Sequence, residues 1–191
     1  MSLIDEDEAL IAAALNGSAY AWEKLVKRYE GRIYNLGLRL TGNASDAMDL
    51  MQDVFLGVYQ NLHRFRGDAK FSSWIFRIAH NKAVDLNRRK KLFVTPRNTE
   101  DDEDPAVNIP SDDDMEPDYR MDQQQLNQQV QQMLALIPHE QRLVVELKVY
   151  QSLTFEEIAD MQDISVNTAK TRFYTALKKL KVVSEEQHVL S

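Results

Sequence analysis

The chain has 191 residues, 43% hydrophobic and 28% charged, which is enough for one domain or two small ones with buried cores. The absence of cysteine excludes disulfides and thiolate metal sites, and it fits a reducing cytoplasm. No apolar run approaches the roughly 20 residues that span a bilayer, and the N-terminus is acidic where a signal peptide is basic. We therefore expect no direct membrane insertion. With only 6 glycines and 5 prolines, the composition favours an all-helical protein.

Apolar spacing and cap residues predict a series of helices in chain order. The first four are separated by Asn-Gly, by Thr-Gly-Asn and by a loop at Phe65–Phe71 that contains a glycine. Ser18 precedes the second helix as a cap residue. The expected helices are Asp5–Leu15, Ser18–Leu40, Ala44–Gln60, Ser72–Lys90, Met121–Ile137, Pro138–Tyr150, Thr154–Met161 and Ser165–Val183.

An acidic, proline-rich segment separates the fourth predicted helix from the fifth. Residues 98–119 contain ten Asp or Glu and no Lys or Arg, and four of the five prolines lie in 92–119. Such a segment cannot bury enough apolar surface to fold alone, so we expect 93–119 to be a flexible tether. The prediction is an all-α protein with two small helical domains, 1–92 and 120–191. The tether either shields the basic regions or serves only as a solubilising spacer.

The net charge of −7 conceals two basic regions. Arg64–Lys91 has nine basic residues against two acidic ones, and Ile164–Lys181 has five basic residues and no acidic ones. Because the acidic balance belongs largely to the tether, both helical domains can still approach a polyanion.

The last two predicted helices have the lengths of a helix-turn-helix. Thr154 and Glu157 fit a capping box, and Ser165 fits an N-cap. The second of these helices has an apolar stripe, made of Val166, Ala169, Phe173, Ala176, Leu177 and Leu180. Its opposite face combines amide, hydroxyl, aromatic and cationic groups, which match base edges and phosphates in the major groove. A solvated face with basic residues near a helix C-terminus is the alternative. The candidate DNA-binding residues are Asn167, Thr168, Lys170, Thr171, Arg172, Tyr174 and Lys178.

The block from Phe65 to Lys91 suits single-stranded nucleic acid. Rings offer surfaces on which bases stack, and a cationic tail follows the phosphates. Taken singly, Phe71, Trp74 and Phe76 are more commonly explained as core residues, so some of the three must be buried.

Two stretches carry a resemblance to a known family. They are "DAMDLMQDVFLGVYQNLHRFRGDAKFSSWIFRIAHNKAVDLNRRKK" and "LIPHEQRLVVELKVYQSLTFEEIADMQDISVNTAKTRFYTALKKL". In that order and at that separation, they resemble the extracytoplasmic-function (ECF) sigma factors of bacterial RNA polymerase, in the sigma-70 family. The resemblance implies a first domain that binds core polymerase and opens the minus-ten element, and a second that binds the minus-35 element as duplex.

The resemblance also implies roles for individual residues. The polymerase contacts would be Asp49, Gln52, Asp53 and Phe55, with Asp53 where the family often has the longer Glu. The minus-ten contacts would be Phe65, Arg66, Gly67, Asp68, Phe71, Trp74, Arg77, Asn81, Arg88 and Arg89. The minus-35 contacts would include Lys170, Thr171, Arg172 and Tyr174.

At the level of the cell, the resemblance implies an alternative sigma factor for a stress or envelope response. Such a protein would be cytoplasmic and not an enzyme, and it would need no cofactor. An anti-sigma factor would be a further partner and could hold the chain at the inner membrane.

Two other functions fit less of the sequence. A helix-turn-helix repressor leaves Phe65–Lys91 unused, and no coiled-coil seam is present for the usual dimer. A metal-dependent hydrolase would need positioned ligands, but the acidic runs lack the spacing of a calcium loop and the four His are scattered. We therefore expect no catalytic residues and no metal site.

Overall fold

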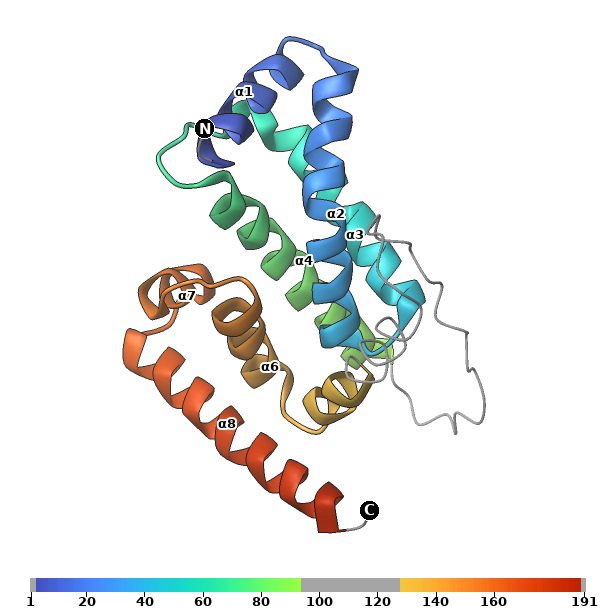
Figure 1. Ribbon diagram of the computed structural model, residues 1–191, viewed down its shortest axis with the longest axis vertical. Coiled ribbons are helices and arrows are strands. Elements are labelled where there is room, and N and C mark those ends of the chain that lie inside the picture. Colours follow the sequence, from blue (N-terminus) through green and yellow to red (C-terminus); the bar gives the residue numbers. More distant parts are fainter. Residues whose placement is uncertain (1–2, 94–127, 190–191) are drawn as a thin grey trace. The chain divides into compact units, whose positions relative to one another are not determined.

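The computed structural model describes residues 3–93 and 128–189, which divide into two compact units (Figure 1). No strand occurs within these residues, and the predicted all-α class is confirmed. The first unit is built on α1 (Leu3–Leu15), α2 (Ala19–Thr41) up to Gly37, α3 (Ala44–Asn61), the short 3-10 helix η1 (Leu62–Arg64) and α4 (Phe71–Phe93). The second unit has helical residues 128–135, α6 (His139–Val145), the π-helical turn η2 (Glu146–Tyr150), α7 (Phe155–Gln162) and α8 (Val166–Val189).

The core of the first unit is formed by apolar positions that recur every three or four residues along its helices. The buried side chains are Leu25, Tyr29, Ile33 and Leu36 of α2, Ala47, Leu50, Val54 and Val58 of α3, and Phe71, Ile75, Phe76 and Ala79 of α4. Gly37 allows α2 to approach α3 closely, because a Cβ atom there would lie 2.8 Å from the Cα of Ala47. Only glycine fits that contact without a shift of one helix.

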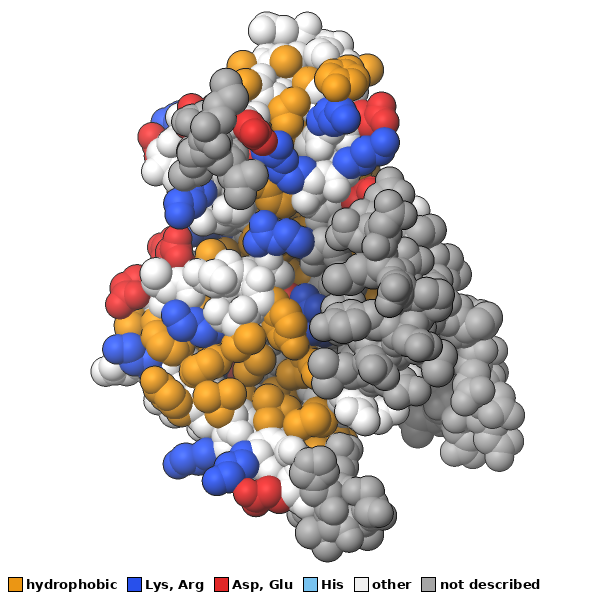
Figure 2. All heavy atoms as spheres, in the orientation of Figure 1, with side chains coloured by type: hydrophobic (Ala, Val, Ile, Leu, Met, Phe, Trp, Pro, Cys, Tyr) orange, Lys and Arg blue, Asp and Glu red, His pale blue; other side chains and the backbone are white. Residues whose placement is uncertain are grey.

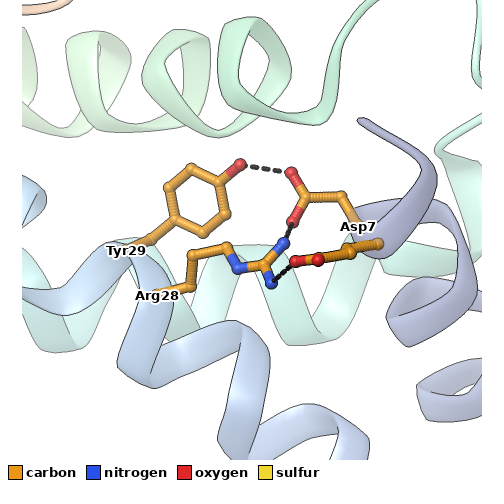
Figure 3. Close-up of polar contacts among 4 residues, drawn as sticks. Asp7, Arg28 and Tyr29 are labelled. Atoms are coloured by element: carbon orange, nitrogen blue, oxygen red, sulfur yellow. Dashed lines mark hydrogen bonds and ion pairs between the residues drawn. The ribbon is translucent and has the colours of Figure 1, made fainter. Parts of the chain in front are cut away.

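An ionic network holds α1 against α2 (Figure 3). Arg28 donates from Nη1 to Asp7 Oδ1 at 2.6 Å and from Nη2 to Glu6 Oε2 at 2.6 Å, and the Tyr29 hydroxyl donates to Asp7 Oδ2 at 2.5 Å. Burial and the hydrogen bond to Asp7 raise the pKa of Tyr29. Because a buried carboxylate is costly unless it is paired, the network explains how Asp7 can sit at an apolar interface.

The second unit has its own apolar cluster. Leu134, Ile137, Val145 and Ala176 are buried, and Val130, Phe173 and Leu180 pack against them. Since Phe173, Ala176 and Leu180 belong to α8, one side of that helix is anchored to the helices before it, and the opposite side remains for other contacts.

Two helices extend beyond their predicted ends. α4 continues through Leu92 and Phe93, the latter the first position of the expected tether, and α8 continues to Val189 instead of ending at Val183. Lys90 and Lys91 near the end of α4 suit the negative end of the helix dipole, which favours the extra turn. The rest of the tether, and residues 121–127 of the predicted fifth helix, lie outside the described residues. No described helix is long and apolar enough to cross a membrane.

Candidate nucleic-acid interface

The helix-turn-helix of the second unit forms as its cap residues predict. The Thr154 hydroxyl accepts from the Glu157 amide at 3.1 Å, and the Glu157 carboxylate accepts from the Thr154 amide at 2.8 Å. Asp163 ends α7 in the left-handed conformation, with φ of 54°. Ser165 Oγ then accepts from the Thr168 amide at 3.0 Å and caps α8. These side-chain bonds satisfy backbone groups that helix ends leave unpaired.

The two predicted faces of α8 are largely separate in the structure. Ala169 and Ala176 are fully buried, whereas Tyr174 is 55% exposed and Lys178 is also exposed. Leu177 was expected in the buried stripe but is 40% exposed, so that expectation was wrong. The reason is its position in the helical repeat, which places it at the margin of a stripe centred on Ala169 and Ala176.

The predicted DNA-binding residues of α8 differ in what else they contact. Asn167, Thr171, Lys170 and Lys178 are exposed. The Thr168 hydroxyl lies 2.8 Å from Ser165 Oγ and so belongs partly to the helix cap.

Arg172 is less exposed than the other predicted DNA contacts of α8, which all lie in the open on that helix. Its side chain is 27% exposed; its Nη2 forms an ion pair with Glu140 Oε2 at 2.9 Å, and its Nη1 donates to Gln162 Oε1 at 3.2 Å. The guanidinium is therefore engaged within the second unit itself.

An aromatic group with two cations lies next to α8. The ring centroids of Phe155 and Phe173 are 5.5 Å apart, and those of Phe173 and Tyr174 are also 5.5 Å apart. The Phe155 ring has Lys148 Nζ 4.7 Å and Lys170 Nζ 6.0 Å from its centroid. Cation–π attraction acts over about 6 Å, so Lys148 lies well within its range and Lys170 at its limit. Figure 2 shows hydrophobic side chains gathered over this unit, with Lys and Arg side chains at its borders.

The loop between η1 and α4 contains the polar part of the predicted minus-ten pocket. Gly67 has φ of +76°, a conformation that favours glycine, and Arg66 and Asp68 beside it are exposed. The predicted turn is therefore present, and it leaves both charged side chains accessible.

Four aromatic rings pack together at the start of α4. The Phe71 ring centroid lies 5.4 Å from that of Tyr29, 5.5 Å from that of Phe65 and 5.6 Å from that of Trp74. Phe71 is 5% exposed and Phe76 1%, whereas Phe65 and Trp74 are half-buried. The expectation that some of these aromatics are core residues is confirmed for Phe71 and Phe76. Phe65 and Trp74 keep part of their ring surfaces open.

Further along α4, Arg77 and Asn81 are exposed, and Asn81 Oδ1 lies 3.2 Å from His80 Nδ1. At the basic end of the helix, Arg88 pairs with Asp85 at 3.3 Å and Lys90 pairs with Asp46 at the start of α3. Arg89 is exposed. The positive charge of this end is thus partly neutralised within the first unit.

The predicted polymerase contacts lie along one stretch of α3. Asp49, Gln52 and Asp53 are exposed, and Phe55 is half-buried with its ring edge-on to Trp22 at 6.5 Å. Sequence reasoning missed Leu56 and Tyr59, which are 55% and 66% exposed on the same helix. The available signal was a pair of apolar residues three positions apart, on one side of α3 and outside the buried stripe of Leu50, Val54 and Val58.

Among the described residues, no group of three or more Asp, Glu or His is placed to hold a metal ion. The acidic run, residues 98–119, lies outside the described residues.

Comparison with known proteins agrees with this arrangement. The sigma-70 region 2 family matches residues 25–93, and the sigma-70 region 4 family matches residues 127–180. The chain is 31% identical to the ECF RNA polymerase sigma factor SigW of Bacillus subtilis over 86% of this chain and 89% of that protein. It is 30% identical to the ECF RNA polymerase sigma-E factor of Escherichia coli K12, over 89% and 90% respectively.

A solved structure of CnrH in complex with the cytosolic domain of CnrY has the same fold. Its TM-score is 0.66 at 24% identity, covering 95% of this chain and 99% of that one. The sigma factor RpoE of Bartonella quintana, solved with the anti-sigma factor NepR, gives a TM-score of 0.63 at 15% identity, covering 85% and 96%. With both family regions in order and relatives matched over nearly their full length, the chain belongs to the ECF sigma factors of the sigma-70 family.

Proposed function

We propose that this sigma factor binds core RNA polymerase and directs it to promoters through two separate DNA contacts. The observation that carries the proposal is the exposed polar and cationic face of α8, presented by a complete helix-turn-helix. The first unit supplies a second basic and aromatic surface. The chain itself would make and break no bond, so the work would be done by binding energy.

The second unit would read the minus-35 element as duplex. In a helix-turn-helix, the first turns of the second helix reach base edges in the major groove, and later turns lie near phosphates. Lys170, Thr171 and Tyr174 fall in the first part, and Lys178 lies about two turns beyond Lys170 and one turn beyond Tyr174. Base-specific contacts would therefore come from the former group and charge neutralisation from Lys178.

The first unit would capture an unstacked minus-ten base. Unstacking a base costs a few kcal/mol, which ring stacking and hydrogen bonds in a pocket can recover. The half-buried rings of Phe65 and Trp74 lie beside the Arg66–Asp68 turn, with their centroids 5.4 Å apart. Asn81 would add an amide for hydrogen bonding, and Arg77, Arg88 and Arg89 would follow the backbone.

Core polymerase would dock on α3 through Asp49, Gln52 and Asp53, with Phe55 supporting the surface from within. The neighbouring exposed Leu56 and Tyr59 would extend this contact with apolar surface. Exposed apolar side chains that lie together commonly mark protein interfaces.

An anti-sigma factor would be the second protein partner, as in the solved complex of the Bartonella sigma factor with NepR. We place the protein in the bacterial cytoplasm and at the inner membrane when such a partner is anchored there. The stress or envelope signal that the partner would transmit is part of this proposal.

Transcription with purified components tests the proposal. The chain is added to core RNA polymerase on promoter fragments enriched by the complex from a randomised pool, and transcripts are measured. Transcript that depends on both the chain and the enriched sequence supports a sigma factor. Binding of DNA without core polymerase, with repression of a transcript from another sigma factor, would support a helix-turn-helix repressor instead.

The tether supplies a second test. Limited proteolysis of the free protein should cut first within 93–119 and leave two resistant fragments, because an acidic, proline-rich segment is accessible to proteases. Early cleavage within α4 with the tether intact would contradict the proposed domain limits.

A further inference from the structure

Arg172 is the member of the proposed minus-35 set whose contacts point back into its own unit. Its guanidinium forms an ion pair with Glu140 of α6 and donates a hydrogen bond to Gln162 of α7, through two different nitrogens. Three helices therefore meet at one side chain. A guanidinium is a planar group whose donors have fixed directions, so two acceptors constrain it far more than one does.

The helical position of Arg172 agrees with these contacts. Arg172 follows Ala169 by three residues and precedes Ala176 by four, and both alanines are fully buried. Residues three and four apart share a side of an α-helix. Thr171 and Lys178, which are seven residues apart and both exposed, mark the opposite side.

The side-chain amide of Gln162 is oriented by its hydrogen bond with Arg172. Its Oε1 accepts from Arg172, while its Nε2 is buried without a hydrogen-bond partner. A buried amide nitrogen without a partner is unfavourable, so the amide orientation is set by the guanidinium and not by other neighbours. If Arg172 left, both ends of this amide would lack partners.

We propose that Arg172 is a positioning residue and not a reader of bases. Glu140 and Gln162 keep its guanidinium in the DNA-bound protein as in the free one, and the contact fixes the rotation of α8 against α6 and α7. Base reading then belongs to Lys170, Thr171 and Tyr174, which project from the exposed side. This inference rests on the proposed minus-35 function.

If Arg172 were a reader of bases, removing the charge of Glu140 would change DNA affinity in the opposite direction. If Arg172 leaves its partners to reach DNA, Glu140 competes with the DNA, and removing the Glu140 charge frees the arginine. Binding then becomes tighter. If Arg172 positions α8, removing the Glu140 charge loosens the helix, and binding to the preferred sequence becomes weaker.

The experiment measures binding of the complete holoenzyme, core polymerase plus the full chain, to two promoter duplexes. One carries the minus-35 sequence that the wild-type holoenzyme enriches from a randomised pool, and the other carries a scrambled minus-35 sequence. The variants are Glu140→Gln, Arg172→Met and the double variant. Glu156→Gln is the matched control, because Glu140 and Glu156 are both exposed acids in the first turns of their helices.

We expect Glu140→Gln to bind the enriched duplex about three- to fivefold more weakly than the Glu156→Gln control, as loss of a partly exposed ion pair allows. The two should bind the scrambled duplex alike. Arg172→Met should weaken binding to the enriched duplex by at least the same factor. The double variant should bind no more weakly than Arg172→Met alone, since both single substitutions remove the same Arg172–Glu140 ion pair.

Binding of Glu140→Gln to the enriched duplex as tight as or tighter than that of the control would overturn the inference, and so would additive losses in the double variant. Circular dichroism checks that each variant folds. Should Arg172→Met unfold, the comparison of Glu140→Gln with Glu156→Gln decides alone. A wild-type holoenzyme that enriches no minus-35 sequence would overturn the proposed function itself, and the inference with it.

Discussion

The two surfaces proposed to contact DNA differ in whether their side chains also pack against the core. On α8, Thr171 and Lys178 are exposed and lie opposite the buried Ala169 and Ala176. At the start of α4, Phe65 and Trp74 are in ring contact with Phe71, which is itself core. Binding and folding are thus separable on α8 but share side chains on α4.

The difference follows from what each surface would bind. Base edges in a duplex groove are read by polar side chains, which can project from a helix without support from the core. An unstacked base needs an apolar ring surface, and such a surface is stable only if much of it is already packed. A substitution on α8 should therefore change DNA binding alone, whereas one in the aromatic group of α4 should change both binding and stability. The substitutions below test this difference.

The largest expected effect is on folding of the first unit. Phe71→Ala should destabilise that unit by about 3–5 kcal/mol, because it removes a buried aromatic ring and leaves a cavity. Both tryptophans, Trp22 and Trp74, lie in the first unit, so their fluorescence during denaturant unfolding reports on it alone. Arg66→Ala in the exposed loop is the control and should leave the midpoint unchanged. A Phe71→Ala protein as stable as wild type would show that α4 carries an independent binding surface, as α8 does.

On α8 the next largest effect should appear in binding and not in stability. Lys170→Ala should cost about 1–3 kcal/mol on the enriched minus-35 duplex and relax the sequence preference. Thermal unfolding should not change, because Lys170 is exposed and contributes only a distant cation–π contact, 6.0 Å from the Phe155 centroid. Lys179→Ala, also exposed on α8, is the matched control. Equal loss on enriched and scrambled duplexes would make α8 only an electrostatic anchor.

Local sequence signals predicted where α7 and α8 begin and which side chains of α8 are exposed, in part. The Thr154 capping box and the Ser165 cap involve residues three apart, so a spacing rule could find them. The contact of Arg172 with Glu140 joins residues 32 positions apart and depends on how three helices pack, which no local pattern encodes. Leu177 was misassigned for a related reason, because spacing alone does not fix the margins of a buried stripe.

In the first unit, local spacing predicted the aromatic group but did not decide which of its rings are buried. Composition and spacing indicated an aromatic group near α4, and the structure confirms that Phe71 and Phe76 are buried. Which rings stay half-buried depends on the path of the Phe65–Lys70 loop. Gly67 turns that loop with a positive φ, which the flanking residues do not predict.

Asn81 tests whether α4 has any contact that is separate from the core. Asn81→Ala should cost on the order of 1 kcal/mol at one preferred minus-ten base, because a single side-chain hydrogen bond is lost. Since Asn81 is exposed, the tryptophan unfolding midpoint should stay at the wild-type value, and affinity for core polymerase should not change. The readout is transcription from promoters that differ only at each minus-ten base. If transcription falls by the same factor whichever base is present, Asn81 does not distinguish minus-ten bases.

The cap of α7 should affect stability of the second unit alone. Thr154→Ala removes the hydroxyl that accepts from the Glu157 amide and should destabilise the helix-turn-helix by about 1 kcal/mol. Hydrogen exchange of α7 amides measures this, with Thr171→Ala as a control that carries no cap. Faster exchange in α7 for Thr154→Ala but not for Thr171→Ala is expected. Unchanged exchange in both would mean that tertiary packing alone holds α7.

Lys178 is the position where α8 should behave most simply. It lies two turns beyond Lys170, on the exposed side, where an ammonium group meets phosphates rather than base edges. Lys178→Ala should therefore weaken binding to enriched and scrambled duplexes equally, leaving the sequence preference intact. Each phosphate contact releases counterions, so the slope of log affinity against log salt should flatten by about 0.9.

The measurement is holoenzyme binding to both duplexes across a salt series, beside Lys170→Ala in the same series. Because a phosphate contact is weakened by salt, the variant and the wild type should converge as salt rises. The difference between the two lysines then divides α8 into a reading part and an anchoring part. A Lys178→Ala variant with an unchanged slope would mean that this lysine stays in solvent, and that the DNA leaves α8 before its fourth turn.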